Sequence, residues 1–139
     1  MYSVYRRIAE RSADESQRLT QRQLGDRLAA IQRDAQGSWL FRLWFEVLAH
    51  AGRDDRFREL AAGFWSGNRS LGAHAIGEAY ATAGRKPPVA PDHLASAMIA
   101  LDIGLAVQHF VDPDAVSLDL YPELFELLFG PFEPPRGQE

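Results

Sequence analysis

The most informative pattern in this chain is a run of residues 94–110 in which apolar side chains fall on every side of a helix. A helix that is apolar around its whole circumference must be covered on both sides. One side can face the protein's own core, and the simplest cover for the other is the same surface of a second subunit. Because the run is followed by a turn at residues 112–114 and a second apolar segment, the pattern predicts a dimerisation element.

Helical spacing of apolar residues continues through the first part of the chain, and no segment alternates as a strand would. A polar, arginine-rich segment over residues 2–19 begins an apolar stripe at Val4 and Ile8. Leu24 and Leu28, with Ile31 one turn later, fall on one helical face. These stripes predict two helices.

The segment 39–51 is apolar on most sides, so we expect this helix to lie centrally. Ser38 is placed to cap its beginning and Gly52 to end it. Asp54 or Asp55 is expected to cap the helix that follows.

That following helix, over residues 55–83, is unusually rich in glycine and alanine. Each interior glycine costs a helix ~1 kcal/mol relative to alanine. The helix should therefore be bent, split near residues 66–68, or closely packed, and the sequence does not choose among these alternatives.

Proline and glycine define the remaining boundaries. Residues 84–91 predict a loop, with a new helix opening at Pro91 or Asp92. The last helix is expected from Leu118 or Asp119 to Phe129. The chain is thus predicted to be an all-α bundle of about six helices.

Length and composition narrow the class of protein. With 139 residues and no cysteine, the chain has the size of one domain and cannot form disulfides or thiolate metal clusters. We predict one domain over residues 1–132 and a disordered tail over 133–139. The beginning lacks the apolar core of a secretory signal, and Asp102 interrupts the apolar run, which disfavours a membrane span. A cytoplasmic protein is expected.

The charge pattern disfavours a general nucleic-acid coat, because the formal net charge is −4 and phosphate binding needs a basic surface. Arginines gather early in the chain, but acidic residues interleave them. This mixture is typical of a solvated helix face.

Several stretches of sequence, in their order along the chain, are similar to one family. They are Trp44 to Ala51, Arg53 to Arg58, Ala79 to Gly84, Pro91 to Ala95, Leu101 to Gln108 and Val111 to Val116. Together they resemble the C-terminal effector-binding and dimerisation domain of TetR-type (tetracycline-repressor-like) transcriptional regulators. The resemblance covers nearly the whole chain.

The front of the chain departs from that family. Its members begin with a three-helix DNA-reading unit that contains a helix-turn-helix, and a fourth helix follows. Here residues 4–11 resemble part of the fourth helix, and no DNA-reading unit precedes them. A trimmed chain, a misassigned start or a genuine half-protein would each explain this. We expect operator DNA to be bound only through the missing unit, because no helix is left to enter a major groove.

The resemblance implies a sensor without catalysis or cofactor. Two regulatory domains would join through their last two helices in a four-helix interface. A small apolar or amphipathic effector would bind within each domain and release DNA, which requires a different affinity for the two states. The protein is therefore expected to be a homodimeric repressor.

Effector sites are mostly apolar and aromatic, with a few polar groups that fix orientation. The candidates are Trp39, Leu43, Trp44, Val47, Phe64, Trp65, Asn68, Leu71, Met98, Leu101 and Asp102. Ordinary core packing competes with ligand contact for each aromatic, and Asn68 could simply mark a break in its helix.

Asp102 is the sharpest polar candidate, because a carboxylate in so apolar a run needs a partner or a raised pKa. It could orient an amine or hydroxyl of the ligand. Alternatively, it could pair with an arginine or histidine inside the fold or across the dimer.

Candidates for the dimer interface come from the last two predicted helices. They are Leu105, His109, Leu120, Tyr121, Leu124, Phe125 and Leu128. In the final helix a leucine row (Leu120, Leu124, Leu127 and Leu128) lies beside an aromatic row (Tyr121, Phe125 and Phe129). Spacing alone does not decide which row meets the partner.

Two other classes compete with a sensor. Glu46 with His50, and His74 with Glu78, are four residues apart and could share a helical face. No third ligand accompanies either pair, so no metal site is predicted, and no nucleophile elbow or phosphate loop occurs. The other class is a ligand-free helical interaction module, which a small-molecule cavity would distinguish from the sensor.

Overall fold

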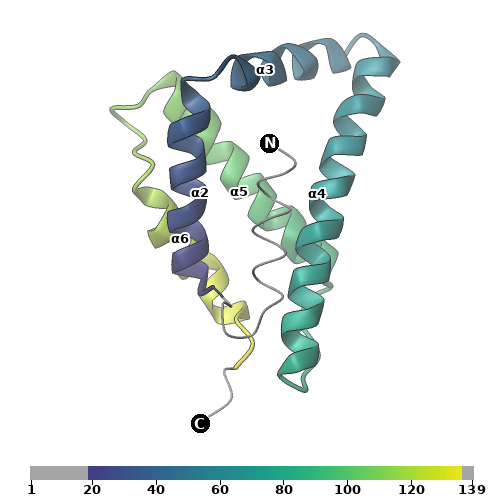
Figure 1. Cartoon of the computed structure of the whole chain (residues 1–139), viewed down its shortest axis with the longest axis vertical. Coiled ribbons are helices and arrows are strands. Elements are labelled where there is room, and N and C mark those ends of the chain that lie inside the picture. The colour runs from purple at the N-terminus through teal and green to yellow at the C-terminus, as the bar shows by residue number, and fades with distance from the viewer. Residues whose placement is uncertain (1–18, 136–139) are drawn as a thin grey trace.

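The computed structural model describes residues 19–135, and this part of the chain is entirely helical apart from turns and loops (Figure 1). The elements are α2 (Gln21–Gln36), α3 (Trp39–Ala51), α4 (Asp55–Thr82), α5 (Pro91–Val111), α6 (Leu120–Phe129) and the 3-10 helix η2 (Gly130–Phe132). The predicted all-α class is confirmed. The helix expected over residues 2–19, with Val4 and Ile8, lies outside the described residues apart from its last position.

Local capping sets the helix ends much as the sequence predicts. Ser38 caps α3 by accepting a hydrogen bond from the Phe41 backbone N–H, and Asp54 caps α4 in the same manner. Pro91 opens α5, where its missing N–H costs nothing. At α2, Thr20 and Gln23 form a reciprocal capping box, which the sequence analysis had not identified.

The helices are arranged in two unequal groups. In Figure 1, α2 and α6 lie side by side with α5 next to them, while α4 leans away and meets α5 at the lower end of the view. Helix α3 spans the upper gap between α2 and α4. The α2–α6 contact is flanked by two surface ion pairs, Arg22–Glu126 and Arg33–Asp119, each with a closest N–O distance of 2.7 Å.

These ion pairs add little to stability, because all four side chains are more than half exposed. The hydrogen bond from Arg22 to Glu126, with the charge of that carboxylate, raises the pKa of the Arg22 guanidinium. The Arg22–Glu126 pair therefore orients the two helices at their surface, and the core carries the packing energy.

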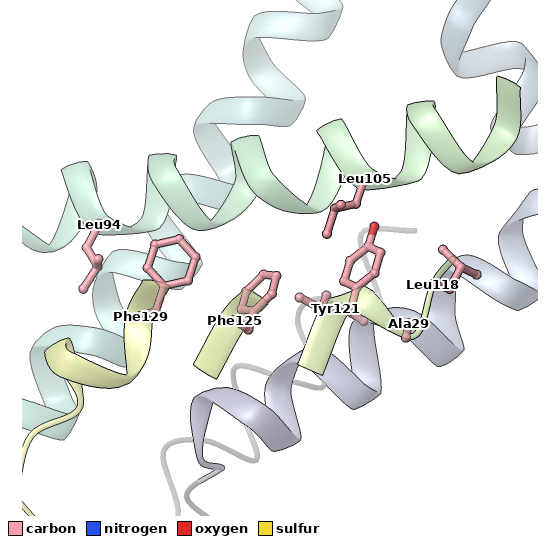
Figure 2. Close-up of a cluster of buried hydrophobic side chains, with 8 residues drawn as sticks. Ala29, Leu94, Leu105, Leu118, Tyr121, Phe125 and Phe129 are labelled. Carbon is pink, nitrogen blue, oxygen red and sulfur yellow. The ribbon is translucent and has the colours of Figure 1, made fainter. Parts of the chain in front are cut away.

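The core lies between α2, α5 and α6. Figure 2 shows the aromatic rings of Tyr121, Phe125 and Phe129 on α6 pointing toward α5, where Leu94 and Leu105 meet them. Tyr121 and Phe125 have no exposed surface. The predicted stripe on α2 is confirmed, since Leu28 is buried and its two neighbours on the stripe, Leu24 and Ile31, pack against this cluster.

Helix α3 differs from its expected central position. Phe41 and Val47 are buried, but Trp39 is 70% exposed and Leu43 is 46% exposed. The helix packs along one side on α4 and touches α2 only at its end. Its Phe41 and Phe45 rings also meet Phe110 near the end of α5. Its apolar composition indicates that the helix must pack against other surfaces. Composition does not indicate which helices provide those surfaces.

Helix α4 is continuous through residues 66–68, so it is not split there. Close packing explains one of its glycines: a Cβ built on Gly72 would lie 3.0 Å from the Cβ of Ala95 on α5. A side chain at this position would push the two helices apart.

Helix α5 has one buried and one open side. Ala95, Asp102 and Ala106 are buried, whereas Phe110 and Val111 are exposed. Among the described residues, α5 alone is long and apolar enough to span a membrane by length and composition, a test that core helices also pass. Since Asp102 is packed and hydrogen-bonded against the other helices, we interpret α5 as a core helix.

Candidate effector cavity

A partly enclosed cavity of about 180 Å³ lies between α2, α4, α5 and α6. Its apolar lining comes from all four helices, from the residue before α2's N-cap, and from η2 with the segment after it: Leu19, Leu24, Leu28, Leu71, Gly72, Ala75, Ile76, Ala79, Leu94, Ala95, Met98, Ile99, Phe125, Phe132 and Pro134. Aliphatic and aromatic side chains thus form most of the surface that a ligand would touch. A few polar groups interrupt it: Gln21, Asn68, Tyr80, Asp102 and Glu133.

Asp102 lies on the side of α5 that faces this cavity and is only 2% exposed. The Gln32 side-chain amide donates a 3.0 Å hydrogen bond to its Oδ1 atom. The Tyr121 hydroxyl donates to the backbone carbonyl of the same residue. Asp102 therefore joins α2 and α6 to the wall of the cavity.

Two side-chain amides bring unpaired oxygens to this region. Asn68 is 6% exposed, and its Oδ1 atom is buried without a hydrogen-bond partner. The Oε1 atom of Gln21 is buried and unpaired as well. Buried polar atoms almost always have a partner, so each of these oxygens calls for an explanation.

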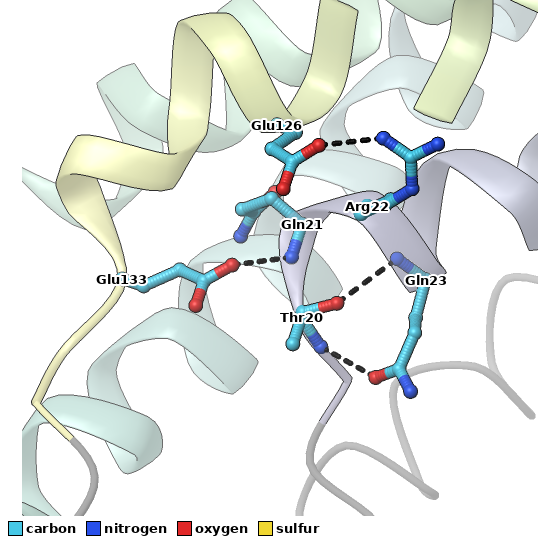
Figure 3. Close-up of polar contacts among 6 residues, drawn as sticks. All are labelled: Thr20, Gln21, Arg22, Gln23, Glu126 and Glu133. Atoms are coloured by element: carbon cyan, nitrogen blue, oxygen red, sulfur yellow. Dashed lines mark hydrogen bonds and ion pairs between the residues drawn. The ribbon is translucent and has the colours of Figure 1, made fainter. Parts of the chain in front are cut away.

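The segment after η2 closes one end of the cavity. The Gln21 backbone N–H donates to the Glu133 carboxylate, as Figure 3 shows. On the opposite side, the Tyr80 hydroxyl donates a 2.7 Å hydrogen bond to the carbonyl of Phe132. Glu133, which the sequence pattern assigns to a disordered tail, is thus held between α2 and the end of α4.

Comparison with known protein families identifies the family to which this chain belongs. The family described as the BetI-type transcriptional repressor, C-terminal, matches residues 27–126. The chain belongs to the TetR-type C-terminal domains. Neither the curated proteins nor the solved structures give a match. Domains of this family generally dimerise, bind small effectors and are not enzymes.

Four of the predicted effector residues line the cavity of this TetR-type domain: Asn68, Leu71, Met98 and Asp102. The other seven do not line it. Trp39 and Leu43 are largely exposed, Val47 is buried, and Leu101 packs against the core cluster.

Trp44, Phe64 and Trp65 form an aromatic cluster between α3 and α4, outside this cavity. The ring centroids of Trp44 lie 4.4 Å from Phe64 and 5.5 Å from Trp65. Their rings cover one another where α3 meets α4, and none of the three lines this cavity.

The sequence reasoning missed most of the cavity wall. Leu24 and Leu28 belong to an apolar stripe that is visible in the sequence. Such a stripe predicts burial but does not distinguish a core from a ligand site. Ala75 and Ile76 carry no signal at all. Glu133 lines the cavity because its segment folds back onto the start of α2, where Gln21 bonds to it.

The predicted interface residues separate into three groups by exposure. Leu105, Tyr121 and Phe125 are at most 5% exposed and pack in the chain's own core, so they present no surface to a second subunit. Leu128, by contrast, is 48% exposed. The others are half-buried: Leu120 and Leu124, with His109, whose Nδ1 contacts the Val116 carbonyl at 2.7 Å.

The two acid–histidine pairs gain no further ligands in the described residues. His50 Nδ1 lies 2.8 Å from the backbone carbonyl of Glu46. Within residues 19–135, no three histidine or acidic side chains gather as a metal site would need.

Proposed function

We propose that this chain is the sensor region of a cytoplasmic, homodimeric repressor. A small apolar or amphipathic effector would bind in the cavity and release a DNA-reading unit from its operator. The observation that carries this proposal is the cavity itself, which combines an apolar wall with a few buried polar groups, as small-molecule sites usually do.

The position of α2 explains how a ligand would be sensed. Leu24 and Leu28 of α2 form part of the cavity wall, and Gln21 stands at its first turn. A ligand that binds more tightly to one position of α2 would shift the population toward that position. Because α2 follows the N-terminal residues directly, the shift would reach a DNA-reading unit placed before them.

Homodimerisation would use the open sides of the last two helices. On α6 two members of the leucine row are open, Leu127 at 66% and Leu128 at 48% exposed, whereas Leu124 packs against the core cluster. On α5 the large exposed apolar residues are Val111 and Phe110, although the Phe110 ring also packs against Phe41 and Phe45 of α3. A two-fold axis would bring each of these surfaces against its own copy.

A thermal-shift screen of apolar and amphipathic metabolites tests the sensor. At least one compound should raise the melting temperature, because a ligand that binds only the native state stabilises it. The variant Ala75→Phe, which places a ring in the cavity, should lose this shift. A variant that keeps the shift would mean that the compound binds elsewhere.

A native domain that no compound stabilises would instead favour the ligand-free interaction module. The DNA-reading part of the proposal has a separate test. The gene sequence upstream of Met1 should encode an in-frame helix-turn-helix. If no such segment is encoded there, the DNA-reading part of the proposal is contradicted and the effector-binding part is unaffected.

A further inference from the structure

We infer that the effector carries a hydrogen-bond-donating head group, a hydroxyl or an amine, which Asn68 holds, on an apolar body about the size of one ring. This inference rests on the proposed function and specifies the chemistry of its ligand. It follows from the unpaired oxygens and the size of the cavity.

Asn68 provides the anchor. Asn68 and Tyr80 are the two polar residues that α4 contributes to the cavity wall; the Tyr80 hydroxyl donates to the Phe132 carbonyl. Asn68 is 6% exposed. Its Oδ1 atom has lost water without gaining a partner. A carbonyl oxygen can only accept, so the group that completes it must donate an O–H or N–H hydrogen.

Gln21 supports the same chemistry independently. Its Oε1 atom is also buried and unpaired, and it belongs to a different helix that lines the same cavity. Both free positions are therefore acceptors. A carboxylate ligand would place more acceptors beside them and beside Asp102 and Glu133, so an acid is the wrong class.

The volume limits the apolar body. An engineered cavity of about 150 Å³ in another protein holds benzene, and this cavity is about 180 Å³. A ligand that fits without rearrangement has about six to ten non-hydrogen atoms by this comparison. Benzyl alcohol is a suitable probe, because it joins one ring to one hydroxyl donor.

A pair of isomers tests the donor. Anisole has the same formula as benzyl alcohol and retains an acceptor oxygen, but it has no donor hydrogen. Isothermal titration of the 139-residue chain should give a Kd about fivefold to tenfold lower for benzyl alcohol, as one additional hydrogen bond implies. Aniline, whose amine is neutral at pH 7, serves as the N–H counterpart, and its Kd should likewise be below that of anisole.

The variant Asn68→Leu should remove this preference and bring the two isomers to equal Kd. The matched control is Trp44→Phe, because the Trp44 Nε1 atom is also buried and unpaired but lies outside the cavity. That control should retain the preference. In the native chain, where no variant needs to fold, the side-chain amide NMR signal of Asn68 should shift further at saturating benzyl alcohol than at saturating anisole, because only the alcohol donates a hydrogen bond to Oδ1.

Equal binding of the isomers by the native chain would overturn the inference and leave the sensor proposal standing. Retention of the preference in Asn68→Leu would overturn it too, as would binding of neither isomer. A failure of the broad metabolite screen, in contrast, would contradict the sensor proposal itself.

Discussion

Gly25 shows how one residue determines a helix contact. A Cβ built on it would lie 2.6 Å from both the Cα of Pro122 and the carbonyl oxygen of Tyr121. Both neighbours are backbone atoms and cannot turn aside as a flexible side chain would. The absence of a side chain at Gly25 therefore allows α2 and α6 to approach this closely.

We predict that Gly25→Ala lowers the free energy of unfolding by about 1–3 kcal/mol, the usual cost of overpacking. Urea denaturation measures this change. Gly63→Ala is the matched control: a Cβ there meets nothing within 4 Å in the interior of α4. It should instead raise the free energy of unfolding by roughly 0.5–1 kcal/mol. Equal stability of the two variants would contradict the close contact.

At the scale of elements, polar side chains hold α5 against α2 in register. Gln32 of α2 donates to the Asp102 carboxylate of α5. One turn further along both helices, Gln36 donates a 3.1 Å hydrogen bond to the Ala106 carbonyl. From the other side, Tyr121 of α6 donates to the Asp102 carbonyl. A wall of the cavity is therefore positioned by directional bonds in addition to apolar packing.

Replacing Gln32 by leucine should destabilise the domain by about 1–3 kcal/mol, because a buried carboxylate oxygen loses a donor. Gln108→Leu is the control, since Gln108 is exposed and its side chain donates to the Gly104 carbonyl of its own helix instead of to another helix. Its effect should stay within about 0.5 kcal/mol. Thermal and urea unfolding would compare the two, and a Gln32→Leu variant as stable as the control would show that this bond does not hold α5.

At the scale of the whole molecule, the open leucines of α6 predict association. Leu127 is more exposed than any other leucine of the core-forming helices α2, α5 and α6 in the described part of the chain. Isolated exposed leucines are ordinary, but Leu127 and Leu128 continue a row that also contains Leu120 and Leu124. A second subunit would remove this row from water.

We predict that light scattering gives a dimer for the native chain at tens of micromolar and a monomer for Leu127→Arg. A charge at the centre of an apolar interface is costly to bury. Leu60→Arg is the matched control, because Leu60 is 59% exposed on α4, close to the 66% of Leu127, but lies away from α6. A native monomer, or equal effects of the two substitutions, would exclude this interface.

Prediction from sequence succeeded for local features and failed for surfaces. The limits of α3 and α5 follow from Ser38, Gly52 and Pro91, whose effects reach only a few residues along the chain. The two rows of α6 were visible as well. The sequence did not show which row enters the core. Tyr121 and Leu120 both fit the apolar helical spacing, and they differ only in which residues pack against them.

The sequence by itself determined the all-α class and most helix ends, because capping, proline and apolar spacing act between residues close in the chain. The family followed from the resemblance of several stretches to TetR-type domains. Only the tertiary structure decided which side of α5 carries Asp102, and that Asn68, Leu24 and Glu133 share one cavity. Those relations depend on contacts such as Gln32 with Asp102, 70 residues apart, and Gln21 with Glu133, 112 residues apart. No local pattern specifies which distant surfaces will meet.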